Sequence, residues 1–439
     1  MFCPVCGKEL EINARFCPEC GATIIGGTPT PYVKPPIQPA TSSATAPIPV
    51  GAPRHSRTYH YHRSRRGLTV GLFIGFLLLA GGGIFGIVIA TNWGNIEGYK
   101  YYYYENPTPA SIEAFHFDVD VADVNIGYNS TPTPYLIEIE YHYRSSGAFL
   151  EGKGFEDLYE VNWENTSAIV YFQSHFKWWT NWIFNDRSVI TITLRSDILY
   201  SIDGDVSTGK LLFSIPDNTT LSTVLLGGST GDITLGIGNG TVFQENFTIG
   251  VSTGSIEIYG NDVEFQEKFI TTASTGDIHV AGHDFRFKDD LYADVSTGSI
   301  TFIFTNPQFG DRVELYASTG DIYVNLIEPE YNVAESTWIG DISTGSFTMM
   351  ITQSTPMGTN VTATIGASTG DISIDVNLES SIGARFLSSV STGSYSYSNA
   401  GGFETLGSVF QTITFPRTSN YYFTLDVTTG DIDVSGLSN

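Results

Sequence analysis

Residues 251–280 have the sequence VSTGSIEIYGNDVEFQEKFITTASTGDIHV, which contains two copies of the unit that builds half of the chain. The tripeptide Ser-Thr-Gly occurs nine times after residue 200, and Thr-Thr-Gly at Thr428 is a tenth copy. The first six copies start 22 or 23 residues apart, and the later intervals are 25, 25, 23 and 37 residues. A period of this size predicts a repeat architecture, in which each unit buries its apolar face only by stacking on its neighbours.

Each unit contains two candidate strands. Apolar and polar residues alternate after the glycine, as in 277–280, and a second alternating run returns before the next copy, as in 291–295. Two strands of about six residues with two turns fill 22 residues, which predicts a flattened β-solenoid over 207–439. The glycine of each copy is expected to need a positive φ angle in its turn. These glycines are Gly209, Gly231, Gly254, Gly276, Gly298, Gly320, Gly345, Gly370, Gly393 and Gly430.

The residue after the glycine alternates between aspartate and serine along most of the repeats. If one copy forms one coil, the alternation keeps carboxylates from stacking about 4.8 Å apart, where repulsion would cost about 0.9 kcal/mol even in water. The rival arrangement is a 44-residue coil, in which the aspartates stack on one edge and could hold calcium. The first arrangement is favoured because it needs no bound ion. The aspartates are Asp232, Asp277, Asp321, Asp371 and Asp431.

The residue before each copy alternates as well. It is small before the aspartate copies, as at Ala273, and branched before the serine copies, as at Val295. Small side chains stacked on large ones interdigitate between coils, which again favours one copy per coil. Val427, before the last copy, departs from this pattern.

An uncharged segment, 68–90, separates two parts of opposite charge. Residues 1–67 contain 8 basic and 3 acidic residues, whereas the rest of the chain contains 13 basic and 43 acidic residues. A helix of this length crosses a bilayer core of about 30 Å, so a transmembrane helix is predicted at 68–91. Five arginines between residues 54 and 66 place the N-terminus in the cytoplasm and the acidic part outside the cell, by the positive-inside rule.

The cysteines and the glycosylation motifs agree with this topology. All four cysteines precede the span, so the outer part needs no disulfide bonds. Six Asn-x-Ser/Thr motifs all follow the span and are candidate N-glycosylation sites. They are Asn129, Asn165, Asn218, Asn239, Asn246 and Asn360.

The N-terminus contains two Cys-Pro-x-Cys-Gly motifs, at 3–7 and 17–21. The two residues between the cysteines of each motif let both sulfurs face one metal ion, and four thiolates select zinc. The predicted ligands of one structural Zn²⁺ are Cys3, Cys6, Cys17 and Cys20. This module, 1–25, resembles the short zinc-ribbon family of many prokaryotic, especially archaeal, membrane proteins. The resemblance implies a closed site without a position for a catalytic water.

Composition divides the remaining residues into segments. Residues 26–53, rich in proline, threonine and serine, are predicted to be a disordered linker, and 54–67 a basic segment at the inner membrane surface. Residues 92–110 are predicted to be an aromatic stalk with tyrosines at headgroup level, and 111–206 a β-rich cap on the first coil. The aromatic run at 171–184 is interpreted as core in preference to a sugar-binding or membrane-binding surface.

The repeats resemble the prokaryotic putative-adhesin domain, a β-solenoid whose hallmark is Ser-Thr-Gly-Asp-Ile. That motif is present at 229–233, 274–278, 318–322 and 368–372, and in part at 428–432. With the earlier strands, the resemblance covers residues 111–437 and implies the fold and an adhesive role. The zinc ribbon together with external glycosylation motifs favours an archaeal source.

The resulting hypothesis is a single-pass cell-membrane protein whose external β-solenoid binds or organises envelope or extracellular ligands. A glycan or protein ligand outside and a protein partner of the zinc ribbon inside are expected, and nucleic acid is not. No nucleophile motif or phosphate loop is present, and the spacing of His279, His283 and Asp284 is not diagnostic, so an enzyme is not expected. The alternatives are an envelope-stress sensor that signals through the zinc ribbon and, less favoured, a polysaccharide-active enzyme.

Overall fold

The structure is a computed structural model that describes residues 93–129, 133–148, 150–166, 168–177 and 184–438. These residues are mainly β, as predicted, and their one helix is the four-residue α2 (Phe155–Leu158). The predicted zinc ribbon, linker, basic segment and transmembrane helix lie outside the described residues. Within the described residues, no helix has the length and apolar character needed to cross a membrane.

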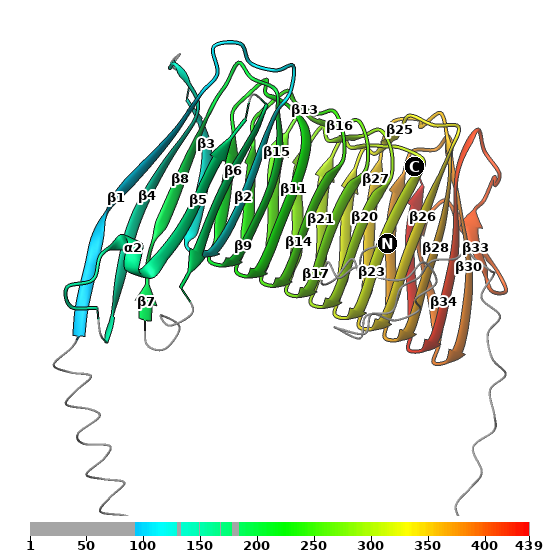
Figure 1. Ribbon diagram of the computed structural model, residues 1–439. Helices are drawn as coiled ribbons and strands as arrows, with labels where there is room; N and C mark the ends of the chain where they lie inside the picture. Colours follow the sequence, from blue (N-terminus) through cyan, green and yellow to red (C-terminus); the bar gives the residue numbers. More distant parts are fainter. Residues whose placement is uncertain (1–92, 130–132, 149, 167, 178–183, 439) are drawn as a thin grey trace, which may run out of the picture. The chain divides into compact units, whose positions relative to one another are not determined.

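Two long arrays of paired strands face each other across a shared core (Figure 1). The first array is a sheet in which most neighbours are parallel and belong to successive repeats. Its strands, in spatial order, are β1 (Trp93–Glu105), β4 (Tyr135–Ala148), β8 (Val189–Arg195), β3 (Asp123–Asn129), β10 (Leu211–Ile215), β12 (Ile233–Ile237), β15 (Ile256–Asn261), β18 (Ile278–His283), β21 (Ile300–Thr305), β24 (Ile322–Ile327), β27 (Phe347–Gln353), β29 (Ile372–Leu378), β35 (Ile432–Ser438) and β31 (Tyr395–Gly401), with β7 (Phe184–Asp186) paired to β4.

The second array contains the strands that lead into each Ser-Thr-Gly turn. Its successive pairs join β5 (Tyr159–Asn165), β6 (Ile169–Phe176), β2 (Glu113–Val121), β9 (Tyr200–Thr208), β11 (Thr220–Thr230), β14 (Phe247–Thr253), β17 (Phe269–Thr275), β20 (Leu291–Thr297), β23 (Arg312–Thr319), β26 (Glu335–Thr344), β28 (Asn360–Thr369), β34 (Ser419–Thr429) and β30 (Ile382–Thr392). β33 (Val409–Thr412) pairs with β30 and with β32 (Phe403–Leu406). A ladder of short strands starts from β11 and contains β13 (Thr241–Phe243), β16 (Val263–Phe265), β19 (Arg286–Phe287), β22 (Gln308–Phe309) and β25 (Glu330–Tyr331).

The strand register places one Ser-Thr-Gly copy in each rung of the stack. Ile256 of β15 pairs with Ile278 of β18, and Ile278 pairs with Ile300 of β21. Successive copies are therefore direct neighbours, and aspartate copies alternate with serine copies along one edge. The 44-residue coil, which would place aspartate copies next to one another, does not occur in these rungs.

The turn glycines have the conformation that the repeats predict. All ten have φ between 135° and 140°, a backbone conformation that residues other than glycine rarely adopt. The stack adds a second constraint, because a Cβ atom on Gly276 would overlap the carbonyl oxygen of Gly254 in the neighbouring rung. Glycine is required here both by its own backbone angles and by the close approach of the rung beside it.

Aromatic rings fill the core at the same interval. Phe243, Phe265, Phe287 and Phe309 lie in consecutive short strands, and neighbouring rings are nearly parallel with centroids 4.9, 5.3 and 5.7 Å apart. All four side chains are at most 1% exposed. Parallel, in-register pairing places identical residues on top of one another, so a residue type that fits one rung also fits the next.

At the C-terminal end, the order of strands in space departs from their order in sequence. β35 lies between β29 and β31, and β34 lies between β28 and β30. The last repeat copy is therefore inserted before the ninth copy. Val427 thereby pairs with the small Ala367 on one side and with the branched Val390 on the other, so the alternation of small and branched residues ends at this rung.

The N-terminal end is also built out of sequence order. β8 lies between β3 and β4, and β1 forms the outermost strand, antiparallel to β4. The expectation of an aromatic stalk at 92–110 is therefore wrong for residues 93–105. These residues alternate between Tyr99, Tyr101 and Tyr103, which are about half exposed, and Tyr102 and Tyr104, which pack inward. The tyrosines pair with a sheet because their period of two matches a strand with one buried face.

Candidate functional site

A column of left-handed turn residues runs along one edge of the stack. The residues lie 22 positions apart and have φ between 52° and 71°: Asn218, Gly240, Asp262, Asp284, Asn306 and Glu328. Asparagine, aspartate and glycine enter this region most easily, which accounts for five of the six. Each backbone N–H also bonds to the next rung, as from Asp284 to the carbonyl oxygen of Thr305 at 2.8 Å. The turn is therefore fixed by the stack, and its side chains point outward at regular intervals.

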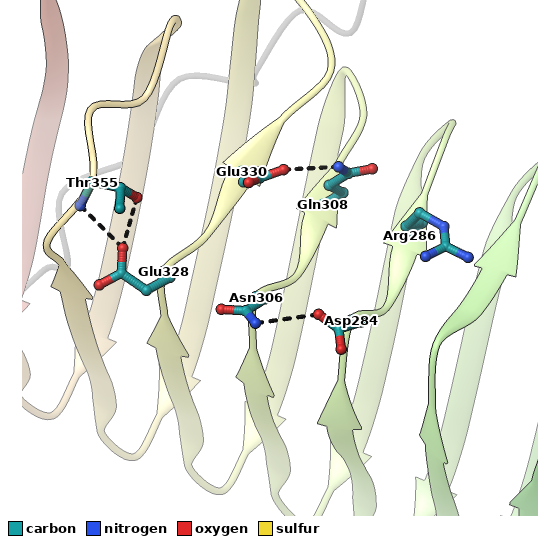
Figure 2. Close-up of a pocket in the computed structure, with 7 residues that line it drawn as sticks. All are labelled: Asp284, Arg286, Asn306, Gln308, Glu328, Glu330 and Thr355. Atoms are coloured by element: carbon teal, nitrogen blue, oxygen red, sulfur yellow. Dashed lines mark hydrogen bonds between the residues drawn. The ribbon is translucent and has the colours of Figure 1, made fainter. Parts of the chain in front are cut away.

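Seven residues in and next to this column line a polar groove with a volume of about 320 Å³ (Figure 2). Asp284, Asn306 and Glu328 come from the turn column. The others come from the neighbouring short strands and from the loop after β27: Arg286, Gln308, Glu330 and Thr355. Three consecutive rungs and one loop thus build the groove, and its side chains repeat with the rung spacing.

Hydrogen bonds connect the groove side chains from rung to rung. The Asn306 side-chain amide donates to Asp284 at 3.2 Å, and the Gln308 amide donates to Glu330 at 2.8 Å (Figure 2). The Glu328 carboxylate accepts from the Thr355 hydroxyl at 2.8 Å. These bonds hold amide and carboxylate groups in two parallel rows.

The groove has a negative balance of charge. Arg286 points away from Asn306 and Gln308 (Figure 2), towards the preceding rung, where it pairs with Asp262 at 2.6 Å and with Glu264 at 3.0 Å. Its charge is thereby matched, and the carboxylates of the groove remain in excess. Rows of amide and carboxylate oxygens suit a ligand rich in hydroxyl or cationic groups, and they disfavour anions.

Glu328 gives the groove a pH-dependent stability. Partial burial alone would raise the pKa of this carboxyl, but hydrogen bonds from Ser354 and Thr355 lower the pKa below its ordinary value. The ionised carboxylate therefore stabilises the fold above the unfolded pKa of about 4.3, and this contribution is lost as the pH falls below that value.

The Thr355→Val variant should lose less free energy of unfolding than the wild type when the pH is lowered from about 5 to about 3. Urea unfolding at both pH values measures the difference, and equal losses would contradict the role of the hydroxyl.

The structure places the predicted aspartates in one column, where their carboxylates accept backbone hydrogen bonds from the next rung. The Asp277 carboxylate accepts the backbone N–H of Ser299 in the next rung at 2.7 Å, and Asp321 accepts that of Ser346 at 2.8 Å. Asp232, Asp277 and Asp321 are two rungs apart, so the structure does not bring these three together as calcium ligands. Asp371 and Asp431 are the exception, because strand insertion makes them neighbours, and Asp371 accepts the N–H of Asp431 at 2.9 Å.

Asp277→Ala should lower the free energy of unfolding by about 1–2 kcal/mol, because it leaves the Ser299 N–H without its charged acceptor. Asp311→Ala, at another exposed turn position, is the matched control and should change stability by at most about 0.5 kcal/mol. Urea unfolding of both variants tests the difference. Equal effects would show that the carboxylate contributes nothing through this bond.

The other predicted positions have varied surroundings. The zinc ligands Cys3, Cys6, Cys17 and Cys20 lie outside the described residues. Of the six glycosylation motifs, the asparagines of four are exposed and those of two are partly buried. The exposed ones are Asn165, Asn218, Asn239 and Asn246, and the partly buried ones are Asn129 and Asn360.

The structure also locates part of the aromatic run and the group His279, His283 and Asp284. In the aromatic run, Phe172 is fully buried while Tyr171 is 39% exposed, and the three tryptophans lie outside the described residues. His279 and His283 lie four residues apart on β18, a separation of about 13 Å along a strand, and Asp284 bonds to Asn306. These three residues do not converge on one site.

The turn column and its groove were not predicted from the sequence. A signal was present, because Asn, Asp or Gly recurs at 22-residue intervals from Asn218 to Asn306. The Ser-Thr-Gly motif marks one turn of each rung, whereas this column belongs to the turn at the other end of the strand.

Comparison with known proteins matches two parts of the chain. The zinc-ribbon domain family matches residues 2–24. Three similar crystal structures are a putative cell adhesion protein from Clostridium sporogenes (12% identity, TM-score 0.19, 78% of this chain and 100% of that chain), a putative adhesin from Parabacteroides merdae (10%, 0.29, 76% and 95%) and a putative adhesin from Bacteroides fragilis (8%, 0.25, 78% and 97%). No curated protein matches the chain. The chain thus has a zinc-ribbon domain at its N-terminus.

Proposed function

We propose that this chain is a single-pass membrane protein whose β-solenoid projects from the cell and binds envelope or extracellular ligands. The observation that carries the proposal is the array of polar side chains on the turn edge, which are present at five of the six rungs from Asn218 to Glu328 and absent only at Gly240. An array of this kind binds an extended ligand by area, and it differs from a catalytic site, where unlike groups converge on one reacting atom.

Charge and topology support the same proposal. The part of the chain after residue 67 has a net charge of −30, while the 67 residues before it have a net charge of +5. This asymmetry and the uncharged segment 68–90 favour an acidic solenoid on the outer side of a membrane. A negative surface repels anionic polymers, so neutral or cationic glycans and proteins with basic surfaces are the ligand classes that fit.

Two experiments on the full chain test the proposal. Protease added to intact cells should digest the solenoid and leave an N-terminal tag intact, whereas digestion of the tag would overturn the topology.

A glycan array that contains neutral, cationic and anionic polysaccharides should show binding by the neutral or cationic members. The double variant Asn306→Ala, Gln308→Ala should weaken it, and Thr248→Ala, on the outer face of β14, is the control. Binding that is unchanged in the double variant would overturn the groove as the contact surface.

Replacement of one cysteine tests the predicted zinc site of the ribbon. Zinc would be held by Cys3, Cys6, Cys17 and Cys20, and it would supply most of the folding energy of a module with almost no core. Cys17→Ser should release the ribbon zinc and expose residues 1–25 to protease, while the solenoid keeps its melting temperature. Metal analysis and limited proteolysis measure both effects. A variant that retains its zinc and its protection would contradict the four-cysteine site.

A further inference from the structure

A histidine and two aspartates converge on the outer face of the N-terminal cap. Asp118 and Asp120 lie on β2, and His175 lies at the end of β6, the parallel neighbour of β2 (Figure 1). Alternation along β2 turns Phe117 and Val119 into the core and both aspartates outward. One ligand atom from each of the three groups can lie within 4.8 Å of the other two. The cluster therefore forms because two strands pair, and it brings together Asp120 and His175, which are 55 positions apart in sequence.

The Asp120 carboxylate fixes the orientation of the His175 ring. One of its oxygens lies 3.1 Å from His175 Nδ1, and the other accepts the backbone N–H of Phe176 at 2.9 Å. Asp120 is therefore held by the main chain, and it in turn holds Nδ1. A carboxylate on one imidazole nitrogen is the arrangement that orients metal-binding histidines and leaves the other nitrogen for the metal.

The free side of the ring faces a second carboxylate. His175 Nε2 lies 3.8 Å from an Asp118 oxygen, which is longer than a hydrogen bond. Two ligands of a tetrahedral zinc ion, each about 2.1 Å from the metal, are separated by about 3.4 Å. The gap between Nε2 and Asp118 is thus close to the one that a shared metal ion requires.

The surroundings favour a cation. Asp118 pairs across the strands with Asp205 of β9, and Asp203 lies two residues before Asp205. Among the ion pairs of the described residues, Asp118 and Asp120 pair with His175 and with no lysine or arginine. Carboxylates gathered without a lysine or arginine partner gain stability from a bound divalent ion.

We propose that His175 Nε2 and the Asp118 carboxylate bind one divalent transition-metal ion, with Asp120 as the positioning residue and water at the remaining positions. The imidazole nitrogen selects zinc-like ions over calcium or magnesium, which prefer oxygen ligands. The ion would join β6 to β2 and so brace two neighbouring strands within the cap. This site is independent of the zinc ribbon, and it does not depend on the ligand proposed for the groove.

The test is a Co²⁺ titration of the full chain in which Cys3, Cys6, Cys17 and Cys20 are all replaced by serine. One Co²⁺ per chain is expected, with a d–d spectrum typical of nitrogen and oxygen ligands and a higher melting temperature. His175→Ala and Asp118→Asn should remove the spectrum, and Asp120→Asn should weaken binding about 10-fold to 100-fold. His283→Ala changes an exposed histidine on β18 and should bind as the parent does.

The outcomes separate a metal site from a structural ion pair. Absence of a Co²⁺ spectrum in the parent, or a spectrum that survives His175→Ala, would overturn the proposal. If His175→Ala destabilises the fold, His175→Gln provides the second variant, since its amide can keep a hydrogen bond to Asp120 without an imidazole. A folded His175→Gln chain that binds Co²⁺ as tightly as the parent would equally overturn it, and lost binding in that folded chain supports it.

Discussion

Gly276→Val is expected to lower the free energy of unfolding by about 4 kcal/mol. Gly276 has a φ of 135°, where a β-branched residue is strongly strained. A side chain would also overlap the carbonyl oxygen of Gly254, which belongs to backbone and cannot rotate away. The neighbouring rungs must therefore separate or the turn must change its conformation.

Gly236→Val is the matched control for this substitution. Gly236 lies on β12, faces outward, and has no atom within 4 Å of the position that a Cβ would take. Valine favours strands, so a change of at most about 0.5 kcal/mol is expected. Urea unfolding followed by circular dichroism measures both variants, and hydrogen exchange of the Gly276 amide, which bonds to the Thr297 carbonyl oxygen at 2.9 Å, reports the local effect. Equal stability of the two variants would contradict the stacking constraint.

Phe265→Ala is expected to lower the free energy of unfolding by about 3–5 kcal/mol. The ring is fully buried and stacks between Phe243, at 4.9 Å, and Phe287, at 5.3 Å. It also contacts Phe247 and Phe269 edge-on, at 5.0 and 4.9 Å. Its removal leaves a cavity in the middle of the stack, which rungs held on both sides by backbone hydrogen bonds cannot close.

The control variant for Phe265→Ala is Tyr259→Ala, in the preceding strand β15. Tyr259 is 42% exposed on the outer face, so its loss should cost less than about 1 kcal/mol. Phe265→Leu should fall between the two variants, because leucine refills part of the volume. Urea unfolding of the three variants tests the order. A cost for Phe265→Ala no larger than that for Tyr259→Ala would show that the ring column does not stabilise the stack.

Both predictions arise from the same property of the fold. In-register parallel rungs place each residue on its counterpart 22 positions away, so one unfavourable side chain affects two neighbours. The effect should nevertheless remain local, because the rungs of a repeat protein contact only adjacent rungs. Hydrogen exchange near Asp123, several rungs from Gly276, is expected to be unchanged in Gly276→Val.

The repeated part of the fold was predictable from the sequence. The 22-residue interval, the period-two alternation and the turn glycines indicate stacked strands, and the Asp/Ser alternation favours one copy per rung. These features are local, or they repeat at a fixed interval, so one unit is enough to infer its neighbour's position. The turn column from Asn218 to Glu328 follows the same rule and could have been found from its spacing.

The two ends of the stack depend on tertiary structure. Nothing in the repeat interval indicates that β35 inserts between β29 and β31, or that 93–105 pairs as an edge strand with β4. The same holds for His175, which meets Asp118 and Asp120 only because β6 lies beside β2. By itself the sequence determined the rung, its turn residues and its stacking partner, because identical units favour identical contacts at the strand spacing. Tertiary structure alone decided which strands close the ends and which distant side chains meet there, because unpaired strand edges accept any strand of suitable length and pattern.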